Sequence, residues 1–147
     1  MLVDTLPLIR RNKQIGGIYY YYNTTFSKWL STDKSIYEFG LNHVNVGESR
    51  WLAVTDGITS NNNGYFISRK STILDITITS KTVAVVDFDL YYDGTIIRSV
   101  NLSGLTFKEN DLNIDIEEDG VLRMFINKVN SGRLGYPIVS VVLCCRL

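Results

Sequence analysis

Apolar and polar residues alternate with a period of two along most of the chain, which is the pattern of half-buried β-strands. In the stretch 71–80, STILDITITS, the alternation predicts one apolar face made of Leu74, Ile76 and Ile78. The stretch 82–100 continues the pattern, with Asp87 and Asp89 on the face opposite to Val86, Phe88, Leu90 and Tyr92. No long segment carries apolar residues at helical spacing, so the pattern predicts an all-β fold.

Turn signals divide this pattern into eight to ten expected short strands. Asp93-Gly94 is a two-residue hairpin signal. A second hairpin is expected where Asp119-Gly120 joins the alternating stretch 112–116 to 121–127, and a nearly continuous apolar strand ends the chain. Turns every 8–12 residues are typical of antiparallel sandwiches. We therefore expect an antiparallel, jelly-roll-like β-sandwich over residues 40–147.

Aromatic residues gather before the sandwich, in the stretch 18–31, IYYYYNTTFSKWLS. A membrane-spanning helix needs about 20 largely apolar residues, and the polar residues here interrupt any such run. Aromatic residues favour strands, so the stretch predicts two short strands around the turn Asn23-Thr24-Thr25. Residues 1–17 are expected to form an extended arm, with Gly16-Gly17 as a flexible joint, followed by the aromatic segment 18–39.

Composition narrows the function classes. The chain has 147 residues, which suits one domain, and 45% of them are hydrophobic. Lys+Arg and Asp+Glu are both 15, so the net charge is zero, which argues against a basic nucleic-acid-binding face. The first residues, MLVDTLPLIRRNKQ, lack the order of a signal peptide because the basic residues follow the short apolar part. We expect neither a nucleic-acid nor a membrane partner.

Candidate chemistry is sparse. Cys144 and Cys145 are adjacent, and neighbours in a strand point to opposite faces, so two inert thiols are expected. The single histidine, His43, has no catalytic or metal-binding motif around it and is expected in a loop or at an edge. Asp87 and Asp89, near Asp93, are either calcium ligands or a solvated strand face, and we favour the solvated face. The sequence predicts no enzyme, no cofactor and no metal site.

Three stretches resemble a small β-sandwich module of tailed-bacteriophage virion proteins, which occurs in head-fibre, capsid-decoration and tail-fibre proteins. Residues 22–31, YNTTFSKWLS, are similar to an opening that reads Tyr-Asp-x-Thr-Arg-x-Lys-Trp-Leu-Ser, with departures at Asn23 and Phe26. Residues 64–73, GYFISRKSTI, are similar to its Gly-Tyr-x-x-x-Arg-x-x-Thr-Ile segment. The third is the later rhythm of an Asp-Gly hairpin, a Leu-Asn-Ile strand and a final strand ending near Arg146. The resemblance covers residues 18–147.

The resemblance implies a non-enzymatic virion protein, assembled in the host cytoplasm and often a homotrimer. It also implies that an N-terminal segment, here the arm of residues 1–17, anchors the protein on the particle. The expected function is that of an auxiliary capsid (decoration) or head-fibre protein, docked on the major capsid protein or another virion protein. The alternative is a tail-fibre tip that binds a receptor or host surface glycan through the loop 59–64, TSNNNG, and exposed tyrosines.

The aromatic segment and the arm supply the expected contact residues. Aromatic side chains are enriched at protein interfaces, although they also fill the core of a single subunit. The interface candidates are Tyr20, Tyr22, Phe26, Trp29 and Leu30. The basic cluster Arg10, Arg11 and Lys13 would contact an acidic partner surface or nucleic acid, or form a plain solvated arm.

Overall fold

The computed structural model describes residues 12–54 and 64–147, which form β-strands and their connections without a helix. Within these ranges no helix is long and apolar enough to cross a membrane. The strands, in chain order, are β1 (Asn12–Ile15), β2 (Ile18–Asn23), β3 (Lys28–Gly40), β4 (His43–Val44), β5 (Arg50–Trp51), β6 (Tyr65–Ile67), β7 (Ser71–Tyr92), β8 (Thr95–Glu109), β9 (Ile114–Ile116), β10 (Gly120–Gly132), β11 (Leu134–Gly135) and β12 (Ile138–Arg146).

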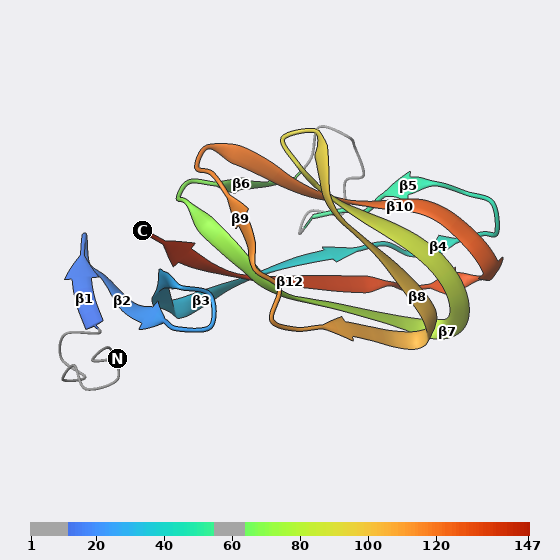
Figure 1. The fold of residues 1–147 in the computed structure, drawn as a ribbon. Helices are drawn as coiled ribbons and strands as arrows, with labels where there is room; N and C mark the ends of the chain where they lie inside the picture. Colours follow the sequence, from blue (N-terminus) through green and yellow to red (C-terminus); the bar gives the residue numbers. More distant parts are fainter. Residues whose placement is uncertain (1–11, 55–63) are drawn as a thin grey trace.

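Ten of the described strands form one curled antiparallel sheet whose two halves face each other (Figure 1). In the first layer, residues 71–79 of β7 pair with β12, and β12 pairs with β3. In the second layer, residues 84–92 of β7 pair with β10, which also pairs with β5 and β6. A second connection between the layers lies away from β7, where a β-bridge joins Gly40 at the end of β3 to Ala53 just after β5. The predicted all-β, antiparallel sandwich is confirmed.

The strand β7 belongs to both layers. The sequence pattern predicted two strands here, but 22 residues form one strand that bends at 80–83. At the bend Ser80 Oγ donates to Thr82 O at 2.8 Å and accepts from Thr82 N at 3.2 Å. β8 follows β7 through both layers, with a shift of register between Thr79 and Ala84. The strands are therefore fewer and longer in this region than the turn signals suggested.

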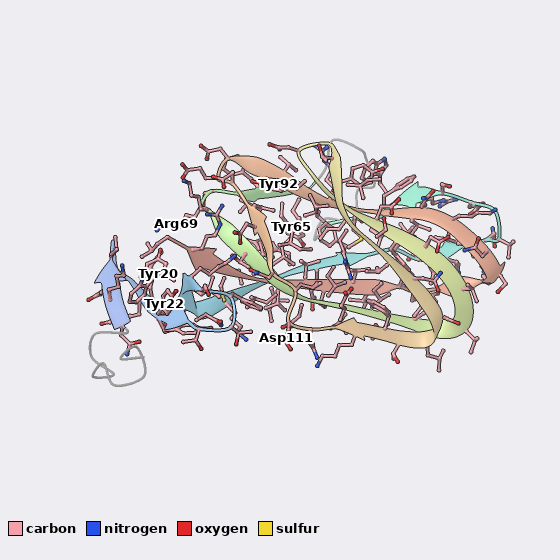
Figure 2. The ribbon with its side chains drawn as sticks, viewed as in Figure 1. Tyr20, Tyr22, Tyr65, Arg69, Tyr92 and Asp111 are labelled. Atoms are coloured by element: carbon pink, nitrogen blue, oxygen red, sulfur yellow. The ribbon has the colours of Figure 1, made fainter. Side chains whose placement is uncertain are left out.

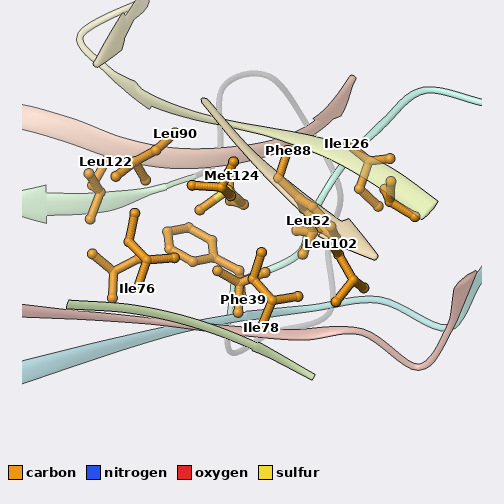
Figure 3. Packing of buried hydrophobic residues seen from close by; sticks show 14 of the residues in the cluster. Phe39, Leu52, Ile76, Ile78, Phe88, Leu90, Leu102, Leu122, Met124 and Ile126 are labelled. Carbon is orange, nitrogen blue, oxygen red and sulfur yellow. The ribbon is translucent and has the colours of Figure 1, made fainter. Parts of the chain in front are cut away.

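The main core lies between the two layers (Figure 3). Ile76, Ile78 and Phe39 of the first layer face Phe88 and Met124 of the second, and all five are at most 1% exposed. The predicted apolar face of Val86, Phe88 and Leu90 is confirmed. Each such side chain contributes roughly 1.5–3 kcal/mol by burial, so this interior holds the layers together.

The prediction that Leu74 shares a face with Ile76 and Ile78 is wrong. A register shift in β7 places Val142 opposite Asp75 and Leu143 opposite Ile73, so Leu74 is an extra residue in the ladder. Because a bulge of this kind moves every earlier side chain to the other face, Ile73 joins Ile76 in the main core. Leu74 packs instead in a second, smaller cluster.

The two Asp-Gly signals have different outcomes. Asp93-Gly94 forms the predicted β7–β8 turn, with φ of 48° and 76°. Asp119 also has a positive φ of 65°, but among the described strands β9 pairs with residues 71–73 of β7 and β10 with residues 84–92. The segment 117–119 thus crosses from one layer to the other, and the predicted hairpin is wrong. A Cβ at Gly120 would overlap the ring of Tyr92.

A three-stranded extension projects from one end of the sandwich, on the side away from the bend of β7 (Figure 1). It consists of β1, β2 and residues 28–31 of β3, which we call the N-terminal sheet. The predicted strands around the Asn23 turn are confirmed, and Asn23 Oδ1 accepts from Phe26 N at 2.9 Å. Gly16 and Gly17 form the tight β1–β2 turn, with φ of 58° and 80°, where a flexible joint was predicted. β3 ends at Gly40, and its residues from Lys34 onward pair with β12 in the first layer.

Candidate functional site

One face of the N-terminal sheet carries aromatic and basic side chains, and we call it the aromatic face. The register pairs Lys13 with Tyr20 and Tyr22 with Trp29, so these side chains point to the same side. Lys13 Nζ lies 3.9 Å from the centroid of the Trp29 ring, and the rings of Tyr22 and Trp29 meet edge to face at 5.5 Å. A lysine over a tryptophan is worth about 0.5–1 kcal/mol when it is exposed. The contact therefore positions the Lys13 and Trp29 side chains and leaves Trp29 only half-buried.

The other face of the N-terminal sheet packs on the sandwich. Leu30 forms the smaller core with Leu74 and Cys144, and Tyr21 and Phe26 pack against it. The turn before β3 thus covers the outer surface of the first layer near the end of β12. This cluster fixes the base of the N-terminal sheet to the sandwich by apolar burial.

The interface candidates fall into two groups by their burial, and the groups do not follow the two faces. Leu30 is 0% exposed and Tyr20 is 4% exposed, so both side chains are enclosed by this subunit itself. Tyr22, Phe26 and Trp29 are half-buried, and each keeps some surface for a partner. Tyr20 and Tyr22 lie on the N-terminal sheet, beside the end of the sandwich at which Arg69 lies (Figure 2).

A polar network fastens the same end of the molecule. Lys28 Nζ, on β3, donates to Asn113 Oδ1 at 2.6 Å and to Asp115 Oδ1 at 2.7 Å. Thr72 Oγ1 donates to the same Asp115 oxygen at 2.6 Å, and Arg146 Nε lies 3.6 Å from it. Burial raises the pKa of Asp115, but the hydrogen bonds from Lys28 and Thr72 and the charges of Lys28 and Arg146 outweigh it and lower the pKa.

This network joins residues that are distant in sequence. Lys28 and Arg146 belong to separate parts of the virion-module resemblance, and both are next to Asp115 in the structure. Arg146 also pairs with Glu117, which lies 3.6 Å from Lys70 Nζ. Sequence reasoning gave Asp115 no role beyond the polar side of a strand, and alternation alone carries no signal for such a cross-strand pairing.

Part of the predicted arm and of the predicted glycan site lies outside the described residues. Arg10 and Arg11 fall in 1–11, and residues 59–63 fall in 55–63. Lys13 is described, and it contacts Trp29 within its own subunit.

The three aspartates considered as calcium ligands hold separate partners. Asp87 accepts from Asn130 at 2.8 Å and from Asn101 at 2.7 Å, and these bonds lower the pKa of Asp87. Asp93 Oδ1 accepts from the backbone N of Val121 at 2.8 Å. Within the described ranges no three His, Cys, Asp or Glu side chains gather so as to hold a metal ion.

Asp89 does not fit the solvated face that was predicted for it. It is only 4% exposed, and Oδ1 accepts from Ser99 Oγ at 2.6 Å. Opposite Asp89 across the ladder stands Phe125, and opposite Phe125 stands Trp51. Phe125 and Trp51 therefore stand in one cross-strand row with this carboxylate.

Three aromatic side chains on this face of the second layer form a cluster that sequence reasoning missed. Trp51, Tyr91 and Phe125, which we call the outer aromatic cluster, come from β5, β7 and β10. The Trp51 ring lies 4.7 Å from Phe125 and 5.0 Å from Tyr91, centroid to centroid. Tyr91 stands two residues from Asp89 on the same strand face, but nothing in the sequence shows that β5 brings Trp51 to this face.

His43 and the cysteines have structural environments. His43 lies in the short strand β4, opposite Gly135, with its ring 4.7 Å from that of Tyr136. Cys144 and Cys145 are both free thiols in β12. Cys144 is 1% exposed, and burial raises the pKa of its thiol.

Comparison with known proteins gives two distant similarities of fold. No protein-family model and no curated protein matches the chain. The PRD1 vertex protein P5 has a TM-score of 0.46 and 11% identity, over 75% of this chain and 95% of that chain. FLHE has a TM-score of 0.36 and 14% identity, over 79% of this chain and all of that chain. At such scores we draw no functional argument from either.

Proposed function

We propose that this protein is a structural component of a tailed-bacteriophage virion, an auxiliary capsid (decoration) or head-fibre protein that docks on the major capsid protein. The observation that carries the proposal is the N-terminal sheet, which projects from one end of the sandwich (Figure 1) and leaves Tyr22 and Trp29 of its aromatic face only half-buried. The module resemblance of residues 22–31 falls on this same sheet.

The N-terminal sheet has two properties suited to assembly. Its outermost described strand, β1, has all four residues exposed and is the end strand of the ten-stranded sheet. An edge strand offers unpaired N–H and C=O groups to another chain. Ile15 of β1 and Tyr19 of the neighbouring β2 are 49% and 58% exposed, so apolar surface accompanies the open edge.

Contacts with the sandwich hold the N-terminal sheet in place, which supports a structural role. The base of the N-terminal sheet is held by the Leu30–Leu74 contact and by the Lys28–Asp115 ion pair. A docking element fixed in this way loses little conformational freedom on binding, which favours affinity. We extend the proposal to a homotrimer in which the aromatic face contributes to subunit contacts.

The proposal is tested by native mass and by binding to capsids that lack the protein. A mass near three times 16.7 kDa is expected for the full chain. Deleting residues 1–17, which removes β1, should abolish capsid binding and leave the sandwich folded. Trp29→Ala should weaken trimerisation or capsid binding, whereas Tyr136→Ala, which removes an exposed ring from the segment between β11 and β12, should change neither.

Two results would contradict the proposal. A monomer that fails to bind capsids at any salt concentration would remove the docking function. Full capsid binding by the Trp29→Ala variant and by the truncated chain would remove the N-terminal sheet from the interface.

A further inference from the structure

The outer aromatic cluster lies on the solvent-facing side of the second layer. Trp51, Phe125, Asp89 and Ser99 form one row across four neighbouring strands, because each is the register partner of the next. The Trp51 ring reaches across β10 to the Tyr91 ring, 5.0 Å away. All three rings of the cluster are half-buried, so part of their surface faces solvent.

Beside the rings lies a buried acid with spare hydrogen-bonding capacity. Asp89 is 4% exposed, and the Ser99 hydroxyl donates to Oδ1. From the described residues no hydrogen bond reaches Oδ2, although this atom is not among the fully enclosed polar atoms. Since a buried carboxylate is costly without donors, this oxygen is suited to receive one from a ligand.

A donor with spare capacity lies on the same face. Arg123 is the register partner of Tyr91 and stands two residues from Phe125, so its side chain leaves the strand on the side of the cluster. Its Nε is buried and has no hydrogen-bond partner among residues 12–54 and 64–147. In the part of the chain that the structure describes, Arg123 has no ion pair with Asp89, whose carboxylate is already bound by Ser99.

We propose that the outer aromatic cluster, together with Asp89 and Arg123, is a carbohydrate-binding site. The charges of the acid and the guanidinium cancel, so the site does not select a charged ligand. A sugar hydroxyl donates to a carboxylate and accepts from a guanidinium, and the apolar face of a sugar ring stacks on an indole. The rings contact one another at 4.7 and 5.0 Å, which leaves no space between them for a cation and favours a stacking platform.

This site is separate from the N-terminal sheet and does not depend on the virion role. It lies on β5, β7 and β10, whereas the aromatic face lies on β1, β2 and β3. It uses none of residues 59–64, to which sequence reasoning assigned glycan binding.

Tryptophan fluorescence of the full chain tests the proposal directly. The chain has two tryptophans, so Trp29→Phe leaves Trp51 as the sole reporter. Cellohexaose, maltohexaose and chitohexaose are titrated separately into this variant. A saturable change of emission with at least one of them is expected, and Asp89→Asn should weaken it by about tenfold or more, since a hydrogen bond to a charged group is lost.

Further variants separate a site from a loss of folding. Trp51→Phe keeps the packing and should weaken binding severalfold, as followed by calorimetry, while Arg123→Gln should weaken it to a similar extent as Asp89→Asn. The Tyr136→Ala variant, which changes an exposed tyrosine elsewhere on the protein, should bind normally.

The proposal is overturned if none of the three oligosaccharides gives saturable binding. It is also overturned if Asp89→Asn and Arg123→Gln, shown to be folded by circular dichroism, bind as tightly as the parent. Saturable binding of tetramethylammonium without sugar binding would assign the cluster to a cation instead and would also overturn it.

Discussion

Lys28 Nζ lies 2.7 Å from Asp115 Oδ1, and this ion pair joins the first residue of β3 to β9. The Lys28 side chain is 18% exposed and Asp115 is 42% exposed, so the pair is partly shielded from water. Asp115→Asn is expected to lower the free energy of unfolding by about 1–2 kcal/mol, because Lys28 and Thr72 lose a charged acceptor. Urea denaturation of the two proteins measures the difference.

The neighbouring acid Glu118 provides the matched control. It is exposed, and no ion pair or hydrogen bond of its side chain is found within the described ranges. Glu118→Gln should therefore stay within about 0.5 kcal/mol of the parent. Equal effects of the two substitutions would show that net charge, and not the Lys28 contact, determines the result.

Acid should destabilise the fold through Asp87 as well as Asp115. The pKa of Asp87 is lowered by hydrogen bonds from Asn130 and Asn101, so its folded-state pKa lies below the unfolded value of about 3.9. The stability from this shift is fully present above the unfolded pKa and is lost as the pH falls through the folded pKa. Between neutral pH and about pH 3, the melting temperature should fall less in Asp87→Asn than in the parent. An equal fall in both proteins would exclude a contribution from Asp87.

The two cysteines should differ in reactivity. Burial raises the pKa of the Cys144 thiol, and only the thiolate reacts with iodoacetamide. Under native conditions mass spectrometry should find alkylation at the half-buried Cys145 first, and at Cys144 only after unfolding in urea. Cys145→Ser should leave the native protein almost unlabelled. Rapid labelling of that variant would mean that β12 opens readily at its end.

Two phenylalanines provide a matched test of the core. Phe88 is 0% exposed between the layers, whereas Phe66 on β6 is 61% exposed. Phe88→Ala should cost about 3–5 kcal/mol of unfolding free energy through lost burial and the cavity left behind. Phe66→Ala should cost less than about 0.5 kcal/mol. Chemical denaturation measures both, and a small loss in Phe88→Ala would contradict the two-layer core.

Alternation predicted the faces of the strands wherever the ladder is regular. It assigned Val86, Phe88 and Leu90 correctly, because β7 itself has no extra residue between Ala84 and Leu90; the shifts in its pairing with β10 come from extra residues on β10. It misassigned Leu74, because a bulge inserts one residue and period-two reasoning has no means of detecting it.

Turn chemistry predicted conformation better than it predicted pairing. Asp93-Gly94 and Asp119-Gly120 both place an aspartate at positive φ, as their sequences require. The first joins two paired strands and the second joins two strands in different layers, because pairing is decided by distant segments such as β6 and β7. For the same reason the sequence could not show that Trp51 would stand beside Tyr91, or Lys28 beside Asp115.

The continuity of β7 has a consequence for how the molecule comes apart. A sandwich of two separate sheets can lose one sheet while the other keeps its hydrogen bonds. Here residues 71–79 and 84–92 are the two ends of a single strand, so each end holds the other in place. Melting of either layer frees the shared strand at the centre of both, and the sandwich should therefore unfold as one cooperative unit.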